Sequence, residues 1–144
     1  MRALAWAMAL GTALVMLALA GVMFFATRSA IRVPAIAAFL TLVTVQLAFM
    51  GGLQAGCALA GERLGRPATL ALLLGWIAPL GAFGIFWLRS TGQQLACALA
   101  LFIVAFAIDA WLVRRALLPR WFLAVRGVFT LLACAATALA LWLA

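Results

Sequence analysis

Five long apolar stretches, separated by short segments rich in arginine, glycine and proline, make up almost the whole chain. Each stretch exceeds the roughly 18 apolar residues that indicate a membrane-spanning helix. Helices are expected because they satisfy their own backbone hydrogen bonds where no water is present. The pattern predicts an all-α membrane protein: a compact bundle of five transmembrane helices with short loops, in one domain over residues 1–144. The predicted helices cover about residues 3–26, 33–60, 68–88, 93–113 and 120–143.

The composition supports this class and changes the meaning of the net charge of +8. The chain is 71% hydrophobic and 8% charged, whereas a soluble domain is usually about 25% charged. The ten positive residues are all arginines, and nine lie at or near the ends of apolar stretches. That distribution is typical of topology signals and phospholipid contacts, and no segment offers the solvated basic face that nucleic acid requires. The expected partners are membrane lipids and other membrane protein subunits or a second copy of the chain.

The first apolar stretch and the arginines predict the orientation. The stretch has about 24 residues, whereas the core of a cleaved signal peptide has roughly 7–15, so we expect a retained helix. With five spans, six arginines lie on the side of the N-terminus and three on the other side, which favours a cytoplasmic N-terminus and an external C-terminus. The six are Arg2, Arg63, Arg66, Arg114, Arg115 and Arg120, and the three are Arg28, Arg32 and Arg89.

Several kinds of chemistry are excluded by the residues that the chain lacks. It has no histidine and only one aspartate and one glutamate, so a protein-built metal site and histidine-ligated haem are not expected. Ser29 and Ser90 have no histidine to act as a base. Cys57, Cys97 and Cys134 have neither metal nor redox spacing and are interpreted as packing residues. The sequence thus predicts a protein that is not an enzyme and that has no cofactor and no metal.

Two opposite charges, Asp109 and Arg126, lie inside the fourth and fifth predicted helices. In a tight antiparallel hairpin centred near residues 117–118, both would lie about 9–13 Å of helix rise from the turn, at the same depth. An ionisable side chain at membrane depth is costly and normally has a partner. We therefore predict a buried charge pair that fastens the hairpin, and the alternative is a proton or substrate site.

A row of small residues at four-residue spacing marks one face of the second predicted helix. Such a row lets another helix approach closely, and internal packing is favoured over dimerisation. Gln54 lies on nearly the opposite face, where an intramembrane amide is expected to bond to another helix or, less often, to a ligand. The row consists of Ala48, Gly52, Gly56 and Ala60.

Trp76 and Pro79 interrupt the regularity of the third predicted helix. Pro79 removes one backbone hydrogen bond and predicts a kink, and the carbonyl of Gly75 that it frees needs another neighbour. Trp76 lies well inside the stretch, whereas Trp121 lies near the end of a helix, where an amphipathic ring prefers to sit. Trp76, Pro79 and Trp121, together with Gln54, are the candidates for polar or ligand contacts.

Several motifs, in this order, resemble the uncharacterised bacterial membrane family called domain of unknown function 3429, which includes eukaryotic transmembrane protein 69. They are FMGGLQAG at residues 49–56, GWIAPL at 75–80, Asp109, PRW at 119–121 and VRGVFT at 125–130. The resemblance covers roughly residues 45–132. It departs where the family usually has a His-Trp pair, since Gln54 and Ala55 stand there. It implies the inner (cytoplasmic) membrane of a bacterium, but the family has no settled activity to carry over.

Two classes of function fit these features. The first is a structural, accessory or assembly component that packs against a larger membrane complex, which the short loops and the absence of a catalytic set favour. The alternative is the binding or transport of a small apolar ligand, lipid or quinone-like, within the bundle. It is favoured by Gln54, Trp76, Pro79 and the charge pair, but ligand sites need converging polar groups and the chain has few.

Overall fold

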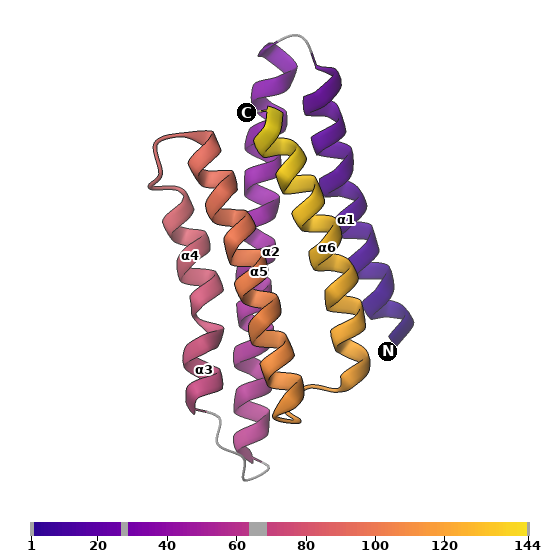
Figure 1. Cartoon of the computed structure of the whole chain (residues 1–144), viewed down its shortest axis with the longest axis vertical. Coiled ribbons are helices and arrows are strands. Elements are labelled where there is room, and N and C mark those ends of the chain that lie inside the picture. Colours follow the sequence, from indigo (N-terminus) through magenta and orange to yellow (C-terminus); the bar gives the residue numbers. More distant parts are fainter. Residues whose placement is uncertain (1, 27–28, 64–68, 144) are drawn as a thin grey trace.

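The computed structural model describes residues 2–26, 29–63 and 69–143, with the side chains of Ala58 and of residues 61–63 left aside. Within these ranges the chain is all helical and contains no strand. Figure 1 shows α3 and α4 stacked end to end on one side of α2 and α5, with α1 and α6 on the other side. The helices are α1 (Arg2–Phe25), α2 (Ser29–Arg63), α3 (Thr69–Gly75), α4 (Ile77–Ile85), α5 (Thr91–Arg114) and α6 (Arg120–Leu143).

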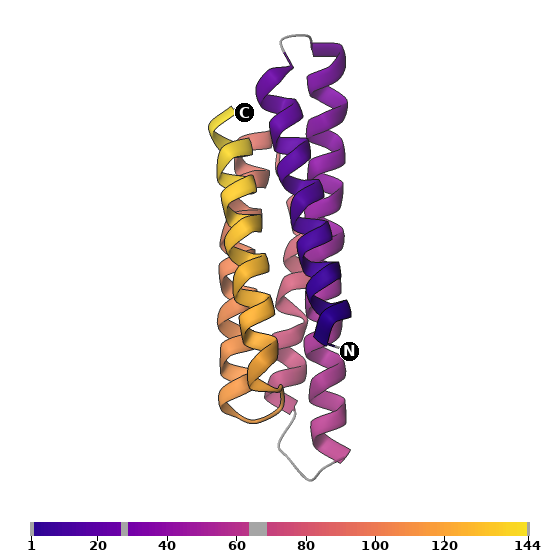
Figure 2. The same cartoon turned by 90° about the vertical axis from the view of Figure 1, so that its right-hand side faces the viewer.

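The longest helix, α2, lies at the centre of the arrangement and contacts α1, α3, α4 and α5. α1 and α6 run side by side in the same direction, as both views show (Figures 1 and 2). The main core is formed by buried apolar side chains from α1, α2, α4, α5 and α6, among them Met16, Phe39 and Phe102. A second, smaller core around Ala71 and Leu112 joins α3 to the hairpin of α5 and α6.

The third predicted helix differs from the prediction of one span over residues 68–88. It is divided into α3 and α4 at Trp76, and the two together cover only Thr69–Ile85. Pro79 has no N–H to donate to the Gly75 carbonyl. At the break itself, the N–H of Trp76 donates to the carbonyl of Leu73, three residues earlier, at 3.2 Å. In the part of the chain that the structure describes, four helices are therefore long and apolar enough to cross a membrane, one fewer than predicted.

The packing face of α2 is also different from the predicted one. Ala48, Gly52, Gly56 and Ala60 are all exposed, and no atom of another described helix lies within 4 Å of a Cβ placed on Gly52 or Gly56. The prediction that these two glycines contact another helix is wrong for helices of this chain. The inner face carries Gln54 and the large side chains Leu47 and Met50. Leu47, Met50 and Gln54 are three and four residues apart and so share one face of the helix, whereas the row of small residues lies on another face.

A turn at Ala116 aligns α5 with α6. The N–H of Leu117 donates to the Leu112 carbonyl and the N–H of Ala116 to the Val113 carbonyl, both at 3.0 Å. This is a Schellman motif, in which the residue at the position of Ala116 adopts left-handed backbone angles and is usually glycine. Ala116 has a φ of 54°. Leu112 and Leu117 pack in the same small core, as the motif's hydrophobic contact requires.

Candidate functional site

Asp109 of α5 and Arg126 of α6 form an ion pair inside the bundle. The Nε–H of Arg126 donates to Oδ2 of Asp109 at 2.7 Å. Asp109 is 0% exposed and Arg126 is 7% exposed. Asp109 lies five residues before the end of α5 and Arg126 six residues after the start of α6, so the two side chains are at a similar distance from the turn, as the hairpin geometry predicts. A charge-assisted hydrogen bond of this length is among the stronger side-chain contacts in proteins.

Gln54 of α2 adds a third helix to the pair. Its Nε2 group donates to Oδ1 of Asp109 at 2.9 Å and to the backbone carbonyl of Ala105 at 2.9 Å. Both partners are acceptors, so the nitrogen rather than the oxygen of the amide must face them. Each carboxylate oxygen of Asp109 therefore accepts a hydrogen bond from a side chain of another helix. The result is a buried network that joins α2, α5 and α6.

Three buried side-chain polar atoms have no hydrogen-bond partner among the described residues, and two of them belong to the network. The three atoms are Oε1 of Gln54, Nη2 of Arg126 and Oγ1 of Thr130. The Arg126 guanidinium carbon lies 5.7 Å from the ring centre of Phe122 and 6.0 Å from that of Phe129. Aromatic faces attract a cation, but they do not accept the in-plane N–H groups. Arg126 thus keeps hydrogen-bonding capacity that the described residues do not use.

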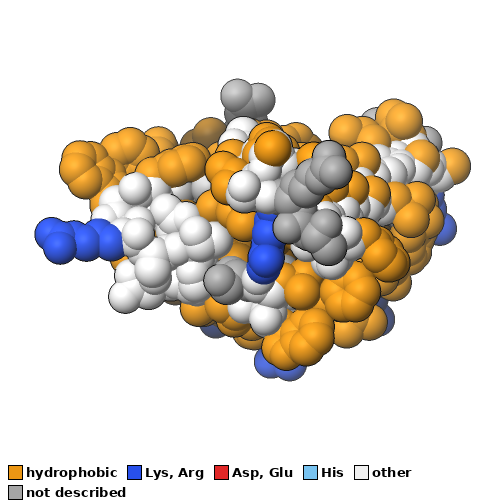
Figure 3. Space-filling model, turned by 90° about the horizontal axis from the view of Figure 1, so that it is seen from above, with side chains coloured by type: hydrophobic (Ala, Val, Ile, Leu, Met, Phe, Trp, Pro, Cys, Tyr) orange, Lys and Arg blue, Asp and Glu red, His pale blue; other side chains and the backbone are white. Residues whose placement is uncertain are grey.

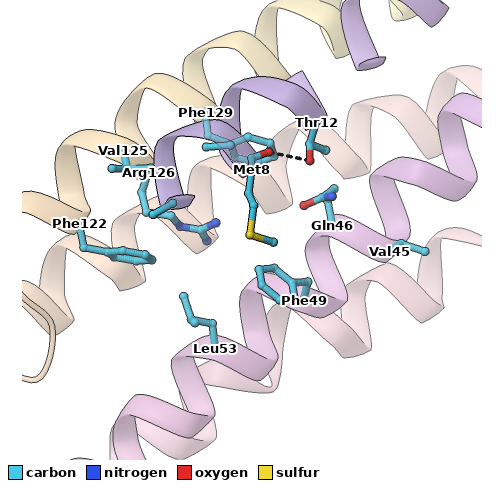
Figure 4. A pocket seen from close by; sticks show the side chains of 12 residues that line it. Met8, Thr12, Val45, Gln46, Phe49, Leu53, Phe122, Val125, Arg126 and Phe129 are labelled. Atoms are coloured by element: carbon cyan, nitrogen blue, oxygen red, sulfur yellow. Dashed lines mark hydrogen bonds between the residues drawn. The ribbon is translucent and has the colours of Figure 1, made fainter. Parts of the chain in front are cut away.

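A cavity of ≈ 320 Å³ lies beside Arg126, between α1, α2 and α6 (Figure 4). Arg126 is the only charged residue among those that line it. Thr12 and Gln46 add a hydroxyl and an amide, and the other lining side chains are apolar. The apolar lining residues are Ala5, Met8, Ala9, Val45, Phe49, Leu53, Phe122, Val125 and Phe129.

The other predicted contact residues lie outside the cavity. Trp76 is 54% exposed at the break between α3 and α4, so its indole points outward. Pro79 packs against Gly51 of α2. Trp121 lies under the guanidinium of Arg2, whose Cζ is 5.6 Å from the ring centre. Gln54 is therefore the one member of this predicted group that joins the charge pair.

Sequence reasoning missed most of the cavity. Its walls on α1 and α2, including Met8, Thr12, Gln46 and Phe49, carry no motif that distinguishes them from other residues of apolar helices. The one available signal was Gln46, a second amide in the same apolar stretch, eight residues before Gln54. A polar residue in such a stretch is a reason to look for a partner or a cavity.

The chemistry open to this site is limited. The described residues contain no group of three or more histidine, cysteine, aspartate or glutamate side chains placed to hold a metal ion. Asp109 is the one carboxylate in the site, and Arg126 and Gln54 already bond to both of its oxygens. A general base must reach the proton that it removes, and Asp109 is buried and is not among the residues that line the cavity. The arrangement is suited to holding helices together and to donating hydrogen bonds.

A family profile described as protein of unknown function (DUF3429) matches residues 1–142. The chain belongs to the DUF3429 family. The match extends the resemblance seen at residues 45–132 to α1 and to nearly all of α6. Searches among curated proteins and among solved structures gave no match.

Proposed function

We propose that this DUF3429 protein is a non-catalytic accessory component of the bacterial inner membrane, which packs against a larger membrane complex or assists its assembly. The observation that supports the proposal is that Asp109 is held by hydrogen bonds from side chains of two other helices. Both of its oxygens are used to hold α5 to α2 and α6. The buried polar groups thus stabilise the bundle, and the protein acts through its contacts with other membrane components.

The exposed surface supports insertion into a membrane. Large apolar side chains are exposed from one end of the bundle to the other, from Leu4 and Leu70 to Trp87 and Trp142. Hydrophobic side chains dominate the rim of the molecule seen along its long axis (Figure 3). A soluble protein rarely exposes apolar patches of this extent. The excess of arginines on the side of the N-terminus supports a cytoplasmic N-terminus and an external C-terminus.

The outward face of α2 supports a protein partner. The row of Ala48, Gly52, Gly56 and Ala60 is exposed, and it leaves the helix backbone open to a neighbour. In membranes, rows of this kind let two helices pack by close van der Waals contact. Because no helix in the described part of this chain covers the row, a helix of another subunit is the occupant that we propose.

Photocrosslinking in native membranes tests the accessory role. A diazirine side chain placed at Gly52 should yield a discrete adduct with a different membrane protein. Gly84 of α4 is the matched control, because it is also a helical glycine with no described atom within 4 Å of a Cβ; it should yield lipid adducts alone. The accessory role fails if position 52 yields no protein adduct, or if the adduct has twice the mass of the chain, which would indicate self-association.

The binding of a small apolar ligand is the second candidate function. A separate observation favours it: the buried guanidinium of Arg126, with an unpartnered Nη2, lines a cavity whose other walls are almost entirely apolar. Ligand sites commonly combine apolar walls with a few polar groups that fix orientation. This function does not require a protein partner, so either candidate can hold without the other.

A further inference from the structure

The side chain of Arg126 places a hydrogen-bond donor beside a cavity whose walls are mostly apolar. Arg126 is 93% buried, being 7% exposed, and its Nη2 has no partner among the described residues. A buried N–H without an acceptor destabilises the folded state, more so on a charged group. Figure 4 shows the guanidinium reaching toward Met8 at the edge of the cavity. An oxygen atom of a bound molecule would supply the missing acceptor.

The charges around Arg126 decide what kind of oxygen fits. Its positive charge is already balanced by Asp109, at 2.7 Å, and Gln54 is neutral. A carboxylate or phosphate placed against Arg126 would leave the group with a net negative charge away from water, which is costly. A carbonyl oxygen accepts the same hydrogen bond and adds no charge. The site therefore favours a neutral acceptor over an anion.

The walls decide what the rest of the ligand must be. The cavity volume of ≈ 320 Å³ lies at the small end of the range for ligand sites. Three phenylalanine rings, Phe49, Phe122 and Phe129, line it. Met8 and Phe49 are each more than half exposed, so the cavity reaches the outer surface of the bundle. A tail can therefore leave sideways, where hydrocarbon chains of the membrane would surround it.

A second polar position lies across the cavity from Arg126. Thr12 donates its hydroxyl hydrogen to the Met8 carbonyl at 2.9 Å, so its oxygen retains the capacity to accept. Gln46 presents its amide beside Thr12 (Figure 4). A head group with two oxygen functions, such as two carbonyls or a carbonyl and a hydroxyl, would meet polar groups at both ends.

We infer that this cavity binds a neutral amphiphile with a carbonyl-bearing head and a hydrocarbon tail, the carbonyl accepting a hydrogen bond from the guanidinium of Arg126. The inference extends the second candidate function and does not depend on the accessory role. Quinones with a hydrocarbon side chain and neutral acyl esters both have this chemistry. The two sources differ in their head groups and are separated by comparing matched probes.

Equilibrium binding to the full chain in detergent tests the inference, with three radiolabelled probes that carry ten-carbon chains. They are a benzoquinone with a decyl side chain, 1-decanoylglycerol, and decanoate as the anion. At least one neutral probe should bind saturably at one molecule per chain, and decanoate should bind about tenfold more weakly or worse. The tighter neutral probe identifies the source as a quinone or an acyl ester. No saturable binding of either neutral probe, or tighter binding of decanoate, would overturn the inference.

Two variants separate the site from the fold. Arg126→Lys keeps a positive charge for Asp109 but lacks the forked guanidinium, and it should weaken binding about tenfold or more. Ala5→Phe fills the cavity from α1 without touching the ion pair and should weaken binding to a similar extent. The control is Ala7→Phe, on the same helix but exposed and outside the cavity, which should bind within about twofold of the unaltered chain. Unchanged binding in Ala5→Phe would show that the probe binds elsewhere.

Discussion

Gly51 of α2 packs against the ring of Pro79 so closely that a Cβ at position 51 would overlap both that ring and the carbonyl oxygen of Gly75. This carbonyl is the one that loses its helical partner because Pro79 has no N–H. The absence of a side chain at Gly51 thus brings α2 against the break between α3 and α4. The glycine of α2 that packs against α3 and α4 is Gly51, whereas the four-residue row of small residues predicts its neighbour Gly52.

Alanine substitutions at the two adjacent glycines should have opposite effects. Gly51→Ala should lower the free energy of unfolding by about 1–3 kcal/mol, because the methyl group meets the Pro79 ring and a backbone carbonyl. Gly52→Ala meets nothing within 4 Å and should leave stability unchanged or raise it by up to about 1 kcal/mol, since alanine favours helix. Thermal and denaturant unfolding in detergent measure both. Equal losses in the two variants would mean that Gly51 does not set the α2–α4 contact.

Ala116→Gly should stabilise the hairpin of α5 and α6. Ala116 has a φ of 54°, a conformation that costs a residue with a Cβ about 1–2 kcal/mol and glycine little. Part of this gain is offset by the greater freedom of glycine in the unfolded chain, so we expect a net gain of about 0.5–1 kcal/mol in unfolding experiments. Ala124→Gly is the control, because position 124 is exposed within α6; it should lose about 0.5–1 kcal/mol. A loss in both variants would contradict the role assigned to the turn.

The sequence was a good guide to the helices and to the charge pair because both depend on local pattern. Apolar length predicts a helix wherever backbone groups must bond within the segment, and α1, α5 and α6 follow directly. Asp109 and Arg126 could be paired because a short turn fixes the register of the two helices that carry them. Pro79 predicts a kink in this segment, but the sequence does not predict its division into the two short helices α3 and α4.

The features that the sequence does not predict depend on contacts between segments far apart in the chain. Gln54 bonds to residues 51 and 55 positions away, and no spacing rule connects them. The choice of Gly51 over Gly52 depends on which face of α2 turns inward, and apolar residues all around the helix leave that rotation undetermined by pattern. The cavity depends on three helices at once, and its apolar walls look like those of any lipid-facing segment.

Replacing Gln54 tests the three-helix network. Gln54→Met keeps the length of the side chain but removes both hydrogen bonds, so Oδ1 of Asp109 loses its partner. We expect a loss of about 1–3 kcal/mol in the free energy of unfolding. Gln93→Met is the matched control, since Gln93 is exposed at the start of α5, and its effect should stay within about 0.5 kcal/mol. A neutral Gln54→Met variant would show that Asp109 does not depend on the amide.

The path of α3 and α4 predicts a membrane crossing by two short helices. Together they cover Thr69–Ile85, about 25 Å at 1.5 Å per residue, and their outer ends lie near opposite ends of α5 (Figure 1). Reporter fusions between α2 and α3 should therefore report the cytoplasm, and fusions between α4 and α5 the outside. A fusion at the C-terminus should also report the outside. The same side for the first two fusions would mean that α3 and α4 do not cross.

A double-mutant cycle on Asp109 and Arg126 distinguishes a fastening pair from two independent polar residues. Asp109→Asn or Arg126→Gln alone leaves one buried charge without compensation, which typically costs about 3–5 kcal/mol. The double variant leaves no such charge, so it should unfold at a higher temperature in detergent than either single variant. The sign of the coupling is informative because neighbours in one network do not add. If the losses simply add, the ion pair at 2.7 Å contributes nothing beyond its two separate side chains, and its role as a fastening of α5 to α6 is wrong.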